Sequence, residues 1–256
     1  MFNNVIVKKP CEAMVNGITS APELGKPDFA LAARQHDAYI AALTQCGVDV
    51  TILEADEEFP DSCFVEDTAV ITKKCAVITN PGAPSRNGEA RRMLPTIRKF
   101  FPDDRIEYIK APGTLEGGDV MMVGDHFYVG CSDRTNLEGI RQFDEILGRY
   151  GLTVSEVELT EVLHLKTGVN YIENNNLLVT GEFVGKQDFA GFNRIVIPEE
   201  EAYAANCIWV NGKVIIPDGY PTVEAAVRSA GYEVILVDTS EYKKLDGGLS
   251  CLSLRF

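Results

Sequence analysis

The sequence lacks the features of a membrane, secreted or nucleotide-binding protein. No apolar run approaches the roughly 20 residues that a membrane-spanning helix needs. Residues 1–9 do not show the three-part pattern of a signal peptide. The Gly-Gly pairs at 117 and 247 have neither GxGxxG nor Walker spacing, so no phosphate-binding loop is predicted. These absences favour a protein that binds neither a membrane nor a nucleotide.

Paired cysteines are also missing. The seven cysteines are an odd number, stand singly in the sequence, and show no CxxC spacing of the zinc-finger or redox kind. This pattern predicts a reducing compartment, which we take to be the cytoplasm. It predicts neither a disulfide framework nor a metal site.

Positive charge is scarce. The chain has 24 Lys and Arg against 38 Asp and Glu, which gives a formal net charge of −14. A nucleic-acid-binding surface would need a basic stripe, so this balance argues against one. A negative cleft would instead attract a cationic substrate. Many cytoplasmic proteins are equally acidic for solubility alone, so the charge does not decide the substrate.

What is present is the composition of a folded α/β protein. The 45% apolar and 24% charged content is ordinary for a globular chain. No low-complexity segment or Pro/Ser-rich linker divides the sequence, so we expect residues 1–256 to form a single domain with a full core.

A loose repeat runs through the chain. Each copy has two short strands, a polar loop, an amphipathic helix and a further strand, and copies begin near residues 69, 119 and 206. In the third copy, Asn211-Gly212 is a type I′ hairpin signal. A unit of about 40 to 50 residues favours a radial, propeller-like array over a doubly wound sheet.

The repeat predicts individual elements by range. We expect helices over 29–45, 89–101, 137–150 and 223–228. We expect a hairpin over 175–183, and strands over 5–8, 48–53, 106–109, 153–159 and 232–237.

Four segments place charged or nucleophilic residues where the repeat predicts strand ends or loops. In a radial array, corresponding loops of different repeats meet at the axis, so these segments are expected to form one site. They are residues 59–67, 115–119, 163–168 and 245–256.

Cys251 and His164 are the candidates for covalent chemistry. We expect His164 at the end of a strand, before a glycine-containing loop. Taken alone, most free cysteines are small buried hydrophobes, and His164 fits a satisfied core histidine equally well. Together they supply a nucleophile and the acid–base partner that it needs. The other two histidines, His36 and His126, are interpreted as structural.

Carboxylates surround this pair in the predicted arrangement. Each fits a turn or strand-end residue by itself, but a cluster of them would repel a developing oxyanion and so disfavours acyl transfer. A planar guanidinium matches carboxylates with paired hydrogen bonds. A cation bound beside the sulfur would also favour the thiolate.

Seven motifs carry a resemblance to a known family. They are Phe-Val-Glu-Asp at 64–67, Pro-Gly-Ala-Pro-Ser-Arg at 81–86, Leu-Glu-Gly-Gly-Asp at 115–119, Arg-Thr-Asn at 134–136, Leu-His-Leu-Lys at 163–166, Ala-Ala-Asn-Cys-Ile at 204–208 and Asp-Gly-Gly-Leu-Ser-Cys at 246–251. Over residues 1–256 the chain resembles the dimethylarginine dimethylaminohydrolases, above all the short bacterial members. The resemblance implies the fold of the guanidino-group-modifying superfamily, a five-bladed α/β propeller (pentein) with pseudo-fivefold repeats.

The resemblance also implies an activity and residue roles. The activity is hydrolysis of asymmetric Nω,Nω-dimethyl-L-arginine, or the Nω-monomethyl compound, to L-citrulline and an amine through a covalent Cys thiouronium. Cys251 would be the nucleophile, His164 the general acid and base, and Glu116 a guanidinium ligand that orients His164. The substrate would further be bound by Ile18, Asp61, Glu66, Asp67, Arg86, Arg134 and Leu245. Residues 17–25 would form a lid.

Relatives and rivals differ at identifiable positions. Arginine deiminases and amidinotransferases resemble the chain but have a catalytic Asp two residues after the His, where this chain has Lys166. Deiminases also tend to have Arg where this chain has Glu66. A deiminase-like hydrolase of another guanidino compound is the alternative. A noncatalytic binding propeller would not need the Cys/His/carboxylate set, and a cysteine protease would need an oxyanion hole.

The resemblance implies no metal and no organic cofactor. The expected partner is a small-molecule substrate, with no nucleic acid and no membrane. Homo-oligomerisation is left open by the sequence.

Overall fold

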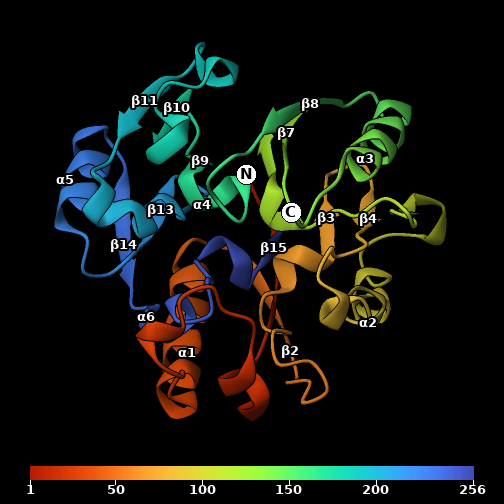
Figure 1. Ribbon diagram of the computed structural model, residues 1–256, viewed down its shortest axis with the longest axis horizontal. Coiled ribbons are helices and arrows are strands. Elements are labelled where there is room, and N and C mark those ends of the chain that lie inside the picture. The colour runs from red at the N-terminus through yellow and green to blue at the C-terminus, as the bar shows by residue number, and fades with distance from the viewer.

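Five three-stranded sheets surround a common axis in a computed structural model that describes all of residues 1–256 (Figure 1). In each sheet the first and second strands are antiparallel, and the second and third are parallel. The sheets are β3 (Ala69–Ile71), β4 (Ala76–Ile78), β5 (Ile106–Tyr108); β6 (Val120–Val123), β7 (His126–Cys131), β8 (Thr153–Glu158); β9 (Val169–Tyr171), β10 (Asn176–Val179), β11 (Asn193–Val196); β12 (Ile208–Val210), β13 (Lys213–Pro217), β14 (Glu233–Val237); and β15 (Leu254–Arg255), β1 (Asn4–Lys8), β2 (Asp49–Leu53).

The last sheet is built from both ends of the chain. β15 pairs antiparallel with β1, with Val5 opposite Arg255 and Ile6 opposite Leu254. Both chain ends therefore lie near the centre of the molecule (Figure 1). This pairing explains why the tail is ordered, because its backbone groups complete a sheet. It also fixes the segment that carries Cys251.

The longer helices lie on the outside and join the parallel strands, as parallel pairing requires a crossover (Figure 1). The crossovers in four sheets are α1 (Phe29–Gln45), α2 (Glu89–Ile97), α3 (Leu137–Arg149) and α5 (Pro221–Ser229). The remaining sheet, β9–β11, has only the short 3₁₀ turns Gly181–Phe183 and Gln187–Phe189 between β10 and β11. The remaining helices are α4 (Leu165–Gly168) and α6 (Ser240–Lys243).

The hydrophobic core consists of local clusters between elements, not of one central mass. For example, Val77 of β4 packs with Phe127 of β7 and Phe143 of α3. Each helix contributes an apolar face at helical spacing, such as Ile140, Phe143 and Leu147 in α3. The centre of the propeller is left with a separate cavity of about 120 Å³, lined by residues from the first strand of each sheet.

Five short turns lie at one end of this axis. Each comes just before the first strand of its sheet, and contacts link η10, η3, η6, α4 and η9 in that order. They are η3 (Val65–Thr68), η6 (Gly117–Asp119), α4, η9 (Glu199–Ala205) and η10 (Ser250–Leu252). We call them the axial turns. Glu66, Asp67 and Cys251 lie in these turns, and Glu116 and His164 directly precede η6 and α4.

The propeller prediction is confirmed, as is the type I′ turn, since Asn211 and Gly212 both have positive φ. Two local predictions were wrong. The hairpin expected over 175–183 is the single strand β10 followed by a 3₁₀ turn, and β10 pairs instead with β9 through a turn of left-handed residues at 173–175. His164 does not end a strand: β8 stops at Glu158, and His164 precedes α4. No helix has the length and apolarity required to span a membrane.

Two glycines of α3 give a matched test of how this helix packs. A Cβ on Gly139 would lie 1.9 Å from the carbonyl oxygen of Thr114, in the loop that leads to Glu116, whereas a Cβ on Gly148 would meet nothing within 4 Å. Gly148→Ala should raise the free energy of unfolding by about 0.5–1 kcal/mol through helix propensity. Gly139→Ala should lower it by about 1–3 kcal/mol through overpacking.

Urea denaturation measures both variants. An equal stabilisation by the two substitutions would contradict the packing, because it would mean that the 110–116 loop is free to move away from α3.

Candidate active site

A narrow cleft of about 40 Å³ lies over the axial turns. Its lining includes all but one of the site residues that the sequence predicts. The lining residues are Ile18, Asp61, Phe64, Asp67, Arg86, Glu116, Arg134, Leu163, His164, Leu245, Asp246, Gly247 and Cys251.

A hydrogen bond joins Glu116, which precedes the β6–β8 sheet, to His164, which precedes the β9–β11 sheet. The Nε2–H of His164 donates to Oε2 of Glu116 at 2.7 Å. The second oxygen of Glu116 accepts the Ala83 N–H at 3.2 Å and lies 3.8 Å from Arg134 Nη1. The side chain of Glu116 is almost completely buried, so this bond fixes the direction of the imidazole ring.

The surroundings of His164 favour its protonated form. Burial alone would lower the pKa of His164, but the carboxylates of Asp119, Glu116 and Asp67 outweigh burial and raise the pKa to about 9. The imidazole ring is therefore protonated on both nitrogens, and positively charged, at neutral pH. A protonated imidazole inside the cleft is suited to the role of general acid.

Asp67 and Arg86 form a buried ion pair. Arg86 Nη1 lies 2.6 Å from Asp67 Oδ2, and the other Asp67 oxygen accepts the Gly118 N–H at 2.9 Å. Burial would raise the pKa of Asp67, yet Arg86, His164 and the Gly118 N–H lower it. Asp67 is therefore ionised and presents negative charge to the cleft. Arg86 is held in turn by Glu89 at 2.7 Å.

The sulfur of Cys251 is held by the turn that follows Gly247-Gly248. The backbone N–H of Gly248 points at Sγ from 3.4 Å. Burial, with the negative charges of Glu66 and Asp67, raises the pKa of Cys251 to about 12. The empty site thus holds a neutral thiol, and formation of the thiolate needs an added positive charge.

The remaining predicted cleft residues sit at its rim. Asp61 Oδ1 accepts the Ile18 N–H at 3.0 Å, which ties the 17–25 loop to the cleft. Burial raises the pKa of Asp61. Leu245 lines the same rim, and Arg134 approaches Glu116 as described.

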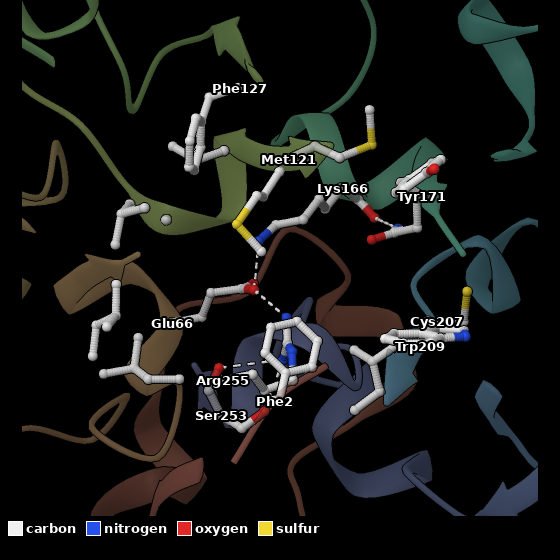
Figure 2. A pocket seen from close by; sticks show the side chains of 18 of the residues that line it. Phe2, Glu66, Met121, Phe127, Lys166, Tyr171, Cys207, Trp209, Ser253 and Arg255 are labelled. Atoms are coloured by element: carbon white, nitrogen blue, oxygen red, sulfur yellow. Dashed lines mark hydrogen bonds and ion pairs between the residues drawn. The ribbon is translucent and has the colours of Figure 1, made fainter. Parts of the chain in front are cut away.

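Glu66 is the exception, because it does not line this cleft. Adjacent residues of the 3₁₀ turn η3 point to different sides, so Asp67 faces the cleft while Glu66 faces the axial cavity (Figure 2). There its carboxylate pairs with Lys166, with Arg255 at 3.2 Å and with the Ser250 hydroxyl at 2.8 Å. Lys166 faces the same way, so this pair separates the cavity from the cleft.

Two functional carboxylates were missed in the sequence. Glu89 supports Arg86, and their i,i+3 spacing at the start of a helix was the available signal. Asp119 accepts the Ser132 hydroxyl at 2.7 Å and the Leu165 N–H at 3.0 Å, and it is the foremost charge raising the pKa of His164. Its position in the Glu-Gly-Gly-Asp motif did not show this contact.

One group of side chains offers ligand atoms for a cation. Oxygens of Asp67 and Glu116 and a nitrogen of His164 all lie within 4.8 Å of one another. Arg86 and protonated His164 already pair with these carboxylates, so a metal ion would have to displace positive charge. A flat organic cation that accepts the existing geometry fits the cleft better.

Comparison with known proteins is consistent with this geometry. A family model described as "N,N dimethylarginine dimethylhydrolase, eukaryotic" matches residues 26–216. The N(G),N(G)-dimethylarginine dimethylaminohydrolase of Pseudomonas aeruginosa is 57% identical over 100% of both chains. The chain belongs to the dimethylarginine dimethylaminohydrolase family. It is therefore an enzyme and a hydrolase.

Other relatives and solved structures agree. A protein of the same name from Streptomyces coelicolor is 31% identical over 98% of this chain and 95% of its own. The Pseudomonas aeruginosa structure, a Cys-to-Ser mutant complexed with citrulline, superposes with a TM-score of 0.98 at 57% identity and full coverage of both chains. The N-terminal domain of the arginine dihydrolase ArgZ, 19% identical, reaches 0.86 over 100% of this chain and 97% of its own, and shares the fold.

The protonation of His164 predicts a pH-dependent contribution to stability. A folded-state pKa of about 9 against an ordinary 6.5 stabilises the fold fully below pH 6.5, and this contribution is lost as pH rises through 9. The stability difference between wild type and His164→Gln should therefore be larger at pH 6 than at pH 9.5, by about 2–3 kcal/mol.

Chemical denaturation at the two pH values measures this difference. His126→Gln is the matched control, since the ring of His126 contacts Thr153 and Tyr128 and forms no ion pair. A His164→Gln difference that does not change with pH would contradict the charged state of the ring.

Proposed function

We propose that this enzyme hydrolyses asymmetric Nω,Nω-dimethyl-L-arginine to L-citrulline and dimethylamine, and the Nω-monomethyl compound to L-citrulline and methylamine. The observation that carries the proposal is the single cleft in which Cys251, His164, Asp67 and Glu116 meet. The 57% identical relative bears the corresponding name.

The first half of the reaction forms a covalent intermediate. The substrate guanidinium lies against Asp67 and Glu116, which hold its nitrogens. When the guanidinium binds, Cys251 releases its thiol proton to solvent, and a lone pair of the thiolate attacks the guanidinium carbon and forms a C–S bond. The bond from that carbon to the methylated nitrogen breaks, and His164 gives its proton to the departing amine. An S-alkylthiouronium on Cys251 remains.

The second half returns the enzyme to its starting state. His164, now neutral, takes a proton from water, and the hydroxide oxygen attacks the same carbon. The C–S bond breaks and its electron pair stays on sulfur. The oxygen loses its remaining proton, which returns to the sulfur as the thiol, and becomes the ureido carbonyl of citrulline. His164 is protonated again, which its raised pKa favours.

The substrate itself supplies the charge that the nucleophile needs. In the empty cleft, burial and two carboxylates raise the pKa of Cys251 to about 12. A guanidinium bound beside Sγ offsets both effects, so the thiolate forms when the correct cation is present. The thiol stays unreactive otherwise.

Arg134 is the principal partner of the substrate carboxylate in this proposal. Most N–H groups of Arg86 already donate to Asp67, Glu89 and the Phe64 carbonyl. One hydrogen on Nη1 remains available to the substrate carboxylate. Arg134 has a single ion-pair contact, at 3.8 Å. The carbonyls of Ile18 and Leu245, at the opposite rim, receive the α-amino group.

Residues 17–25 act as a lid. The Ser20 N–H and hydroxyl donate to the carboxylate of Asp246 at 2.6 and 2.8 Å, which closes this loop over the cleft. The cleft has a volume of only about 40 Å³ with the loop in this position, which supports a movement of the loop when substrate binds. We therefore expect the loop to open for substrate entry.

The proposal extends to the whole chain and its compartment. Residues 1–256 act as one catalytic domain, supported by the pairing of β15 with β1 and by the contacts among the axial turns. Seven free cysteines support a reducing, cytoplasmic location.

Substrate turnover tests the proposal. Purified enzyme is incubated with asymmetric dimethylarginine, arginine and agmatine, and citrulline and amine release are followed by mass spectrometry. Dimethylarginine should give citrulline and dimethylamine. Cys251→Ser should abolish turnover, while Cys131→Ser, at a half-buried cysteine outside the cleft, should retain it.

Two outcomes contradict the proposal. Turnover of arginine alone would indicate the deiminase-like alternative, and unchanged turnover by Cys251→Ser would exclude covalent catalysis at this sulfur.

A further inference from the structure

The pseudo-fivefold symmetry points to an unassigned residue. In four sheets, the segment just before the first strand places a side chain in the site: Asp67 before β3, Glu116 before β6, His164 before β9 and Cys251 before β15. The fifth sheet has the corresponding segment before β12. Asn206, immediately after η9, stands there and is 8% exposed.

The orientation of the Asn206 amide follows from its neighbour. The backbone N–H of Ser250 lies 2.9 Å from Oδ1 of Asn206, and a backbone N–H only donates, so the atom that it meets is the oxygen. The amide nitrogen must then face the other way. It faces the sulfur of Cys251, with Nδ2 at 3.9 Å from Sγ.

A second donor completes the arrangement. The Gly248 N–H lies 3.4 Å from the same sulfur. A Cβ on Gly248 would come 2.3 Å from Cγ of Asn206, so only glycine lets this backbone and this amide lie together beside Sγ. The two N–H groups thus converge on the sulfur from different segments.

The charged groups near Sγ do little to stabilise the thiolate, which makes the N–H groups of Asn206 and Gly248 important. Of the groups that influence Cys251, two carboxylates oppose the thiolate, and the one nearby ammonium, that of Lys166, is directed at Glu66. The charged and titratable groups around the sulfur are Glu66, Asp67, Lys166, Tyr203 and, across the cleft, His164. None of them donates a hydrogen bond to Sγ, whereas Asn206 and Gly248 do.

We propose that Asn206 is a catalytic residue whose side-chain N–H, together with the Gly248 N–H, stabilises the thiolate of Cys251. The role begins when the guanidinium enters and the sulfur loses its proton, and it recurs when the C–S bond breaks and the electron pair returns to sulfur. Oδ1 of Asn206 meanwhile accepts the Ser250 N–H and so holds η10, the turn that carries Cys251, in place. This inference deepens the proposed function and rests on it for the reaction steps.

Asn206→Asp separates the two tasks of the side chain. The variant keeps an oxygen for the Ser250 N–H but replaces the donor beside Sγ with a carboxylate oxygen. Alkylation of Cys251 by iodoacetamide, followed on its own peptide by mass spectrometry over a pH series, reports the thiolate without any substrate. The alkylation profile should shift to higher pH, so that its midpoint rises and the alkylation rate at each pH below the midpoint falls. kcat should fall by about 10- to 100-fold with little change in KM.

Two further variants secure the result. Asn206→Ser removes the amide without adding charge, so its midpoint should lie between wild type and Asn206→Asp, and it keeps the test open if the Asp variant does not fold. Asn176→Asp makes the same chemical change where the amide donates to Tyr232, on the outer part of another sheet, and should leave alkylation and turnover unchanged.

The readouts distinguish this inference from the proposed function. A wild-type alkylation midpoint in both Asn206 variants overturns the role of Asn206, whether or not kcat falls, because lost kcat alone would show only that the turn is misplaced. Failure of the wild-type enzyme to release citrulline would overturn the proposed function and leave the alkylation result unaffected.

Discussion

The close packing of the five axial turns is the constraint on which the site depends. At Gly117 a Cβ would lie 2.0 Å from the carbonyl oxygen of Glu66, so η3 and η6 meet backbone to backbone. This contact brings Asp67 and Glu116 to one cleft. The pairing of β15 with β1 brings η10, which carries Cys251, to the same cleft. The propeller thus assembles, from segments far apart in the sequence, groups that no single segment contains.

In the proposed mechanism, the charges of the site keep Cys251 inactive until a guanidinium binds. Asp67 is ionised because Arg86 faces it, and His164 is protonated because carboxylates surround it. Cys251 stays a thiol in the same field. A guanidinium changes only the last of these states, because it adds positive charge beside the sulfur. Specificity for a cation and activation of the nucleophile therefore have the same physical origin.

The sequence predicted the architecture because each copy of the repeat carries local signals. Strand alternation, the Asn211-Gly212 turn and the apolar face of α3 depend on neighbours in the chain. The hairpin at 175–183 was wrong because Glu173, Asn174 and Asn175 all adopt left-handed conformations, which places the turn before β10; the asparagines were the available turn signal. The side to which a residue of a short 3₁₀ turn points was beyond sequence reasoning, so Glu66 was placed with Asp67. Asn206 lay within a recognised motif, but its contact with Cys251 arises only when two distant turns meet.

The covalent intermediate is the central claim, and rapid acid quenching during turnover tests it most directly. Peptide mass spectrometry after quenching should find an adduct on Cys251 and on no other cysteine. The adduct from dimethylarginine and that from monomethylarginine should have the same mass, because the methylated amine has already left. Adducts that differ by a methyl group, or an unmodified Cys251 throughout turnover, would contradict the account.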